Sequence, residues 1–280
     1  MSRIALTALA ASALLLAGCG GEAAKHATLK QAAPKHDKAI SRSFEFGDRS
    51  LYLQCAGSGR PTVVMDAGMA NDHDTWKAVA PAISKLTRTC TYDRAFEGLS
   101  DPLPCCGKRT SADIVADLRR LLSRAGVAPP YLLVGHSFGG LNMRLFAGAH
   151  PRDVLGLVLI NPTGSFEGEC SISATICAND KTSWEGNPER IDIEKSTREL
   201  AATRLPPIPL ILLLNRWERD PSISARLFKR LEMRARRDSQ RLVASVPDGR
   251  LEIVPGGHFT QDDHPAIVIN AISAVLKKAR

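Results

Sequence analysis

The sequence is poor in the features that mark several classes of protein. Phe, Trp and Tyr make up only 5% of its 280 residues, and no aromatic-rich basic patch is present. It also lacks the ligand spacing of a zinc site and the pattern of a helix-turn-helix. The formal net charge of +8 therefore does not indicate a nucleic-acid-binding protein. Gly57-Ser58-Gly59 is too short for a phosphate loop and precedes a strand pattern, so no cofactor or metal is expected.

The apolar stretch near the N-terminus, Ile4 to Ala17, is too short to span a bilayer. It ends in Leu16-Ala17-Gly18-Cys19, which resembles the signal of bacterial lipoproteins, cut just before the Cys. This resemblance implies a signal peptide over residues 1–18. It also implies export and a lipidated Cys19 that anchors the protein to the extracytoplasmic face of the cell membrane. The alternative is an ordinary secretory peptide cleaved nearby, with Cys19 incidental.

Residues 19–42 form the next segment, which is rich in Ala and Lys and has no apolar periodicity. We expect it to be a basic tether, either attracted to anionic headgroups or simply solvated. Residues 43–280 then suffice for one large α/β domain and are too few for two enzymatic domains.

Short apolar runs and helical patterns alternate along this domain. Strands are predicted over residues 43–46, 51–55, 62–66, 88–93, 131–134, 154–160, 208–214 and 251–254. Helices are predicted over residues 75–86, 111–125, 139–150, 226–241 and 265–278. Such alternation indicates a mostly parallel sheet with helices on both faces. The polar segment 163–207 interrupts it and is expected to form a short cap or lid.

The most specific motif is Gly135-His136-Ser137-Phe138-Gly139, which fits the G-x-S-x-G pattern of a nucleophile elbow. A strand pattern precedes it and a helical pattern follows it. The tight turn requires small residues around Ser137 and places its hydroxyl at a helix N-terminus, where backbone N–H groups can stabilise an oxyanion.

From about Phe44 onward the chain resembles the α/β-hydrolase superfamily. The segment Val63 to Met69 is similar to the family's strand and oxyanion loop, although Asp66-Ala67-Gly68 replaces the usual His-Gly form. The resemblance implies that the backbone N–H groups of Met69 and Phe138 form the oxyanion hole.

A second segment, Tyr92-Asp93-Arg94 followed by Gly98 to Asp101, resembles the family's Y-D-x-x-G-x-G-x-S pattern. Phe96-Glu97 stands where that pattern has another Gly. The resemblance implies that this segment shapes the floor of the site without being catalytic.

Serine needs a base to take its proton, and in this family the chain order is Ser, acid, His. His258 follows the last predicted strand and is the expected base. His264 is expected at a helix boundary, and His136 is expected to point away from the base position.

The acid of the triad should follow the strand over 208–214. Asp220, which precedes Pro221, is the expected acid, and Glu218 is a near alternative. Some family members take the acid from one strand earlier, which would nominate Glu167. In each case the carboxylate would fix the tautomer of the imidazole and stabilise the imidazolium.

These residues predict a serine hydrolase that cleaves small-molecule esters through an acyl-enzyme. Serine at the elbow argues against epoxide hydrolase and dehalogenase chemistry, which in this superfamily use Asp there. Two alternatives remain, a cofactor-free perhydrolase or haloperoxidase and a non-catalytic binding lipoprotein. The presence of both Ser137 and His258 argues against the second.

Six cysteines remain once Cys19 is set aside, and an exported protein meets an oxidising compartment. In this fold the segments that carry Cys55 and Cys90 lie close together, so we expect a bond between them. We also expect Cys170–Cys177 as a staple within the cap. Cys105 and Cys106 are expected to stay free or to pair externally, in preference to a vicinal bond.

Overall fold

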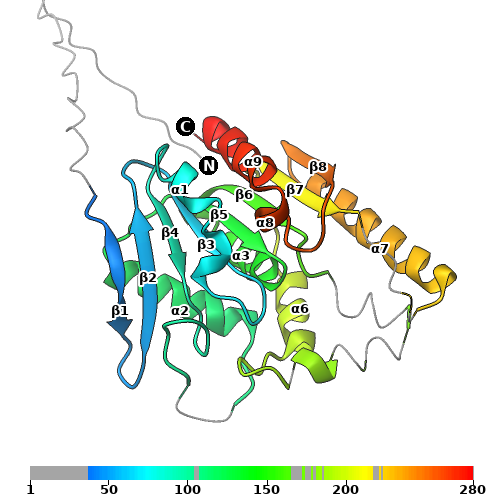
Figure 1. The fold of residues 1–280 in the computed structure, drawn as a ribbon, viewed down its shortest axis with the longest axis horizontal. Helices are drawn as coiled ribbons and strands as arrows, with labels where there is room; N and C mark the ends of the chain where they lie inside the picture. The colour runs from blue at the N-terminus through cyan, green and yellow to red at the C-terminus, as the bar shows by residue number, and fades with distance from the viewer. Residues whose placement is uncertain are drawn as a thin grey trace, which may run out of the picture. The chain divides into compact units, whose positions relative to one another are not determined.

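The computed structural model describes residues 37–103, 107–164, 172–173, 178, 181–184, 186–216, 221 and 223–279. Within these residues eight strands form one sheet, in the order β1-β2-β4-β3-β5-β6-β7-β8 (Figure 1). The strands are β1 (Ile40–Glu45), β2 (Ser50–Ala56), β3 (Thr62–Asp66), β4 (Thr89–Tyr92), β5 (Tyr131–His136), β6 (Val154–Ile160), β7 (Leu210–Asn215) and β8 (Gly249–Val254). The ladder from β4 through β3 to β8 is parallel, and β1 and β2 are antiparallel to their neighbours.

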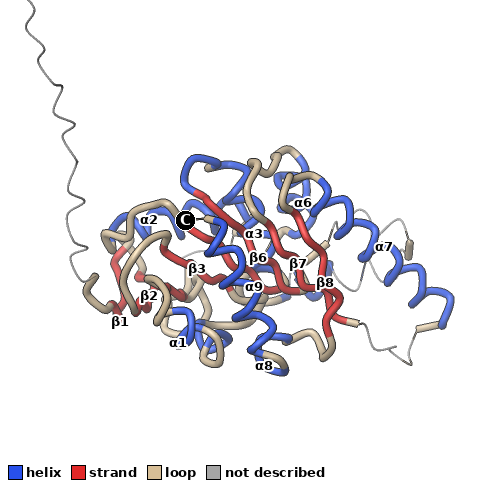
Figure 2. The backbone as a smooth tube through the Cα atoms, turned by 90° about the horizontal axis from the view of Figure 1, so that it is seen from above, coloured by secondary structure: helices blue, strands red, loops and turns tan. Residues whose placement is uncertain are grey.

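Helices cover both faces of this sheet. They are α1 (Ala80–Ile83), α2 (Ser111–Arg124), α3 (Phe138–Ala149), α6 (Ile193–Ala201), α7 (Ala225–Ala244), α8 (Thr260–Asp263) and α9 (Pro265–Lys278), with short 3-10 turns at His73–Trp76 and Pro151–Asp153. Figure 2 shows α1 and α8 on one side of the row of strands and α2 and α6 on the other. Both faces of the central strands are therefore apolar.

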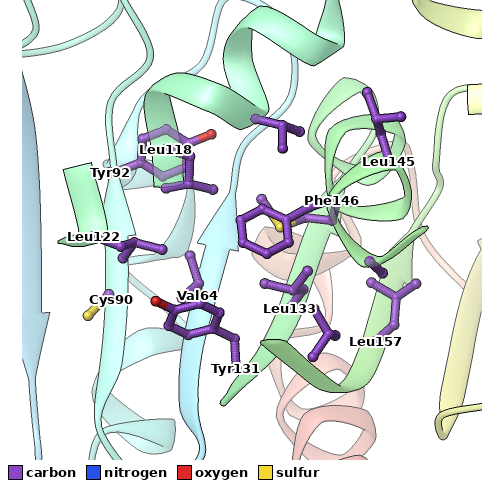
Figure 3. Close-up of a cluster of buried hydrophobic side chains, with 14 of the residues drawn as sticks. Val64, Cys90, Tyr92, Leu118, Leu122, Tyr131, Leu133, Leu145, Phe146 and Leu157 are labelled. Atoms are coloured by element: carbon purple, nitrogen blue, oxygen red, sulfur yellow. The ribbon is translucent and has the colours of Figure 1, made fainter. Parts of the chain in front are cut away.

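The core is divided by the sheet into two layers. In β3, Val63 and Met65 pack on the side of α1 and α9, whereas Val64 packs on the side of α2 and α3. Figure 3 shows the second layer, in which Leu118 and Leu122 of α2 and Phe146 of α3 belong to one apolar cluster. Successive side chains of a strand point to opposite faces of the sheet. Because helices cover both faces, every residue of β3 is buried.

The order of the strands locates the site. β3 and β5 are neighbours, yet the chain leaves β3 for β4 on one side and returns to β5 on the other. At such a switch point the loops after the two strands diverge and leave a crevice at the carboxyl edge of the sheet. The loop after Asp66 and the turn at Ser137 flank this crevice.

The predicted elements agree closely with the observed ones, with two exceptions. The helix predicted over residues 75–86 is wrong: a 3-10 turn at His73–Trp76 is followed by the short helix α1. Pro81 stands in the first turn of α1, where its missing N–H is tolerated, whereas inside a longer helix it would break a hydrogen bond. The sheet also begins at Ile40, so residues 40–42, which we expected in the tether, belong to β1.

The expected bond between Cys55 and Cys90 is present. The two residues face each other directly in the antiparallel ladder of β2 and β4, and both are buried. The bond therefore staples the antiparallel edge of the sheet to its parallel centre. Cys19, Cys105, Cys106, Cys170 and Cys177 lie outside the described residues.

The segment 163–207 lies between β6 and β7, as an insertion in the sheet would. Its described part includes α6 and the helical residues 181–184, which end in Trp184. Ile191 and Ile193 pack with Phe138 and Leu141 of α3 in a third apolar cluster, which Trp184 also joins. No helix in the described part of the chain is long and apolar enough to cross a membrane.

Candidate active site

Ser137 stands on a strained turn between β5 and α3. Its backbone angles are φ 51° and ψ −117°, in a region that non-glycine residues rarely adopt. The turn is held by backbone hydrogen bonds, from Ser137 N to Ile160 O (2.9 Å) and from Gly140 N to Ser137 O (2.9 Å). The tight turn predicted at Ser137 is therefore formed, with Ser137 as the N-cap of α3.

Two glycines make this turn possible. A Cβ atom on Gly135 would collide with the backbone of Gly139, and one on Gly139 would collide with the carbonyl oxygens of Asp66 and Ala67. The second contact shows that the N-terminus of α3 lies directly against the loop after β3. The two expected oxyanion donors, Met69 and Phe138, come from these two adjacent segments.

The backbone N–H groups of Met69 and Phe138 are the expected oxyanion donors. Phe138 is the first residue of α3, so its N–H has no acceptor within the helix. Among the described residues, the Met69 N–H has no hydrogen-bond acceptor. Their arrangement is consistent with the predicted oxyanion hole, which stays a prediction.

The Tyr92-Asp93-Arg94 segment makes hydrogen bonds to the loops that adjoin the site. The buried carboxylate of Asp93 accepts hydrogen bonds from His73 N (2.7 Å), His73 Nδ1 (2.8 Å) and Leu99 N (2.9 Å). Arg94 donates to the carbonyls of Ala67 (2.8 Å) and Gly68 (2.6 Å) in the loop that leads to Met69. Both side chains therefore organise loops around the site.

His258 lies in the loop after β8 and lines the same cavity as Ser137. Its main-chain carbonyl accepts hydrogen bonds from His136 Nε2 (2.9 Å) and Asn161 Nδ2 (2.9 Å). Asn161 also donates to Thr260 Oγ1 (3.1 Å) and accepts from Asn215 N (2.7 Å). One asparagine thus ties the ends of β6 and β7 to the loop of the expected base.

The interpretation of His136 as pointing away from the base is wrong. Its ring lies 4.8 Å from that of His258, between centroids, and is fully buried. Because a carbonyl only accepts, Nε2 of His136 carries a hydrogen. Burial, and secondarily the charge of His258, lowers the pKa of His136 to about 3, so it remains neutral at physiological pH.

The expected base is itself in a suitable protonation state. Burial lowers the pKa of His258 below its usual value, so the imidazole is neutral near pH 7 and able to accept a proton. His264 is the N-cap of α9, as expected of a boundary residue.

Ser137 and His258 line a cavity of about 1000 Å³. Leu212, Leu214 and Leu231 supply apolar walls, and Trp184 of the cap segment also lines it. Trp184 packs edge-on against Phe138, with ring centroids 5.0 Å apart. The cavity can therefore hold an organic substrate next to Ser137, in contact with the cap.

The three carboxylates considered for the acid, Asp220, Glu218 and Glu167, lie outside the described residues. Among the residues that are described, no group of three or more His, Cys, Asp or Glu side chains could hold a metal ion.

Sequence reasoning missed the supporting residues of the site. His136 and Arg94 stand inside motifs that the sequence analysis identified, and this position could have indicated their supporting role. Asn161 directly follows the apolar run of β6, where a polar side chain reaches the carboxyl edge of the sheet. Nothing in the local sequence distinguishes Glu189, which contacts Arg94 across 95 positions.

Comparisons with known proteins agree with this architecture. A family model described as alpha/beta hydrolase fold matches residues 61–184. The uncharacterised protein YqjL of Bacillus subtilis is 37% identical over 115 residues, which cover 41% of this chain and 44% of YqjL. An AB hydrolase superfamily protein of Gibberella zeae is 28% identical over 120 residues, which cover 40% of this chain and 37% of that protein. The chain thus spans less than half the length of these relatives.

Solved structures extend the likeness over most of the chain. The carboxylesterase CesB of Bacillus subtilis superimposes with a TM-score of 0.59 at 17% identity, covering 86% of this chain and 92% of CesB. A mutant epoxide hydrolase of Vigna radiata gives a TM-score of 0.63 at 13% identity, covering 86% of this chain and 99% of that one. The chain therefore has the α/β-hydrolase fold.

Proposed function

We propose that the protein is a serine hydrolase that cleaves carboxylic esters through an acyl-enzyme intermediate. The observation that carries this proposal is the position of Ser137. It occupies a strained elbow at a helix N-terminus and lines one cavity together with a neutral His258. A binding module has no need for this strain, which is characteristic of a functional turn.

In the proposed reaction, His258 removes the proton of the Ser137 hydroxyl while Oγ attacks the ester carbonyl. The backbone N–H groups of Met69 and Phe138 stabilise the oxyanion of the tetrahedral intermediate. The protonated His258 then gives its proton to the leaving alcohol, and the acyl group remains on Ser137. Water, activated by His258, releases the acid and restores the free serine.

A carboxylate completes this scheme by accepting the Nδ1 hydrogen of His258. We assign this role to Asp220, with Glu167 as the alternative. No cofactor takes part, because the nucleophile, the base and the oxyanion donors are all supplied by the chain.

Esters of different acyl length, hydrolysed by wild-type and Ser137→Ala protein, test the proposal. Ser137→Ala should lose hydrolysis and labelling by a fluorophosphonate while it keeps its circular dichroism spectrum. Ser123→Ala, on the exposed face of α2, is the matched control and should behave as wild type. Full activity of Ser137→Ala would refute the proposal.

We further propose that the protein is exported and anchored to the membrane by lipid on Cys19. This rests on the sequence Leu16-Ala17-Gly18-Cys19 alone. Cys19→Ser should move the protein from the membrane to the soluble exported fraction with unchanged specific activity. A wild-type protein with a mature N-terminus other than Cys19 would contradict the proposal.

A further inference from the structure

Arg94 is a buried cation with every hydrogen-bond donor in use. Its side chain is only 2% exposed. Of the five N–H bonds of a guanidinium, two reach the main-chain carbonyls of Ala67 and Gly68. The others reach Asp66 Oδ1 (2.7 Å), Glu189 Oε1 (2.8 Å) and Glu189 Oε2 (2.6 Å). An ion network so completely paired is rigid, because any rotation of the guanidinium breaks several bonds at once.

This network fixes the direction of one particular N–H group. The Gly68 carbonyl and the Met69 N–H belong to the same peptide unit, which is planar and trans, so they point in opposite directions. With the Gly68 carbonyl bound to buried Arg94, the Met69 N–H faces away from the network. Glycine at position 68 would otherwise let this peptide plane rotate at little cost.

Glu189, which lies within the cap segment, completes the arrangement. Its carboxylate is fully buried, makes two bonds to Arg94, and also accepts from the backbone N–H of Ala70, which directly follows Met69 (3.4 Å). Burial works to raise the pKa of Glu189, but the charge and hydrogen bonds of Arg94 outweigh it, so the group is ionised. The ion pair therefore bonds to both neighbours of Met69, with Arg94 bound to the Gly68 carbonyl and Glu189 to the Ala70 N–H.

The network also reaches the other expected donor segment. Asp66 accepts from Asn142 Nδ2 (3.0 Å) on α3, and the Arg94 guanidinium lies 5.6 Å from the centroid of the Phe138 ring. The loop after β3 and the first turns of α3 therefore share the same buried charges.

We propose that Arg94 and Glu189 are positioning residues that hold the Met69 N–H toward the oxyanion, so that the cap segment helps to set the geometry of the oxyanion hole. This inference rests on the proposed function, since it assigns a role within the same reaction. It predicts that disturbing the network weakens binding of the transition state more than binding of the substrate.

Two conservative variants test it. Glu189→Gln keeps the shape of the side chain and removes its charge, and Arg94→Lys keeps the charge and removes the planar fork. Each should lower kcat by about 10–100-fold and leave KM within about threefold of wild type. This loss of kcat should not exceed the loss caused by removing one oxyanion donor. Affinity for an aryl trifluoromethyl ketone, which forms an oxyanion on the serine, should fall by the same factor as kcat/KM.

Values of kcat are expressed per active site, titrated by the fluorophosphonate burst, so that a smaller folded fraction does not count as lost catalysis. Glu189→Asp keeps the charge at shorter reach; it should fold even if Glu189→Gln does not, and should show an intermediate loss. Arg88→Gln is the matched control. Arg88 is also a buried arginine with an acidic partner, Asp37, at 2.8 Å. Arg88 precedes β4, whereas Arg94 follows β4. It should lose stability with kcat within about twofold.

The two proposals fail differently. A wild-type protein that neither reacts with a fluorophosphonate nor hydrolyses any ester contradicts the proposed function. A reactive wild type whose Glu189 and Arg94 variants keep kcat and ketone affinity within about threefold contradicts the positioning role alone. The positioning role is equally contradicted if Arg88→Gln loses as much kcat per active site as those variants do.

Discussion

His136 Nε2 donates a hydrogen bond to the main-chain carbonyl of His258 over 2.9 Å. The residue that precedes the nucleophile is therefore bonded to the backbone of the base. Ser137 and His258 follow strands that are not neighbours in the sheet. The bond from His136 connects their two loops, and the bond from Asn161 ties the end of β6 to the loop of His258. The relative position of the nucleophile and the base depends on these two side chains.

Replacement of His136 should therefore impair catalysis without preventing folding. His136→Phe keeps an aromatic ring and removes the donor, and kcat should fall about tenfold because the loop of His258 loses the bond that joins it to the turn of Ser137. Steady-state kinetics on a soluble ester would measure this, with KM little changed. His150→Phe, at the other end of α3, is the control and should keep the wild-type kcat.

The pH dependence of kcat/KM reports the state of His258. The base must be neutral, so activity rises with pH as His258 loses its proton. Because burial lowers the pKa of His258, the acid limb should have its midpoint below 6.5. His136 has a pKa of about 3 and adds no second limb in this range. A midpoint above 6.5 would mean that the carboxylate partner of His258 outweighs burial.

Much of the fold could be predicted because burial on both faces leaves a continuous apolar run. The strands over Thr62–Asp66 and Val154–Ile160 and the helix over Pro265–Lys278 have the predicted bounds. The start of β1 was missed because Ser41 and Arg42 are exposed on an edge strand, where no apolar alternation is required.

The residues of the site also divide into those that the sequence predicts and those that it does not. That Ser137 and His258 lie at one cavity could be predicted, because their motifs impose small residues and a fixed chain order on the local sequence. Glu189 could not, because its burial depends on a partner that only the folded chain brings near. A charged residue in a polar segment indicates a solvated surface, and its pairing with Arg94 becomes visible only in three dimensions.

The bond between Cys55 and Cys90 should stabilise the fold without affecting catalysis. It closes a loop of 35 residues and joins β2 to β4, whereas Ser137 follows β5. The double variant Cys55→Ala/Cys90→Ala should lower the free energy of unfolding by about 2–4 kcal/mol, measured by urea denaturation. An equal midpoint for variant and oxidised wild type would show that the bond contributes nothing, and kcat should be unchanged in both.

The assignment of the acid can be decided by three matched variants. Asp220→Asn should lower kcat by about 10³–10⁴-fold, because the imidazole loses the carboxylate that fixes its tautomer. Glu218→Gln and Glu167→Gln should remain within a few fold of wild type. If Glu167→Gln is the damaging change and Asp220→Asn is mild, the acid follows β6 and the assignment to Asp220 is wrong.

The central claim, that Ser137 carries the acyl group, is tested most directly by trapping the intermediate. Wild-type protein mixed with a 4-nitrophenyl ester and quenched in acid should gain the mass of one acyl group, and peptide mapping should place it on the peptide that contains Ser137. His258→Ala should gain none in the same time, because the hydroxyl keeps its proton. An acyl group found on another residue, or hydrolysis that continues in Ser137→Ala, would contradict the account.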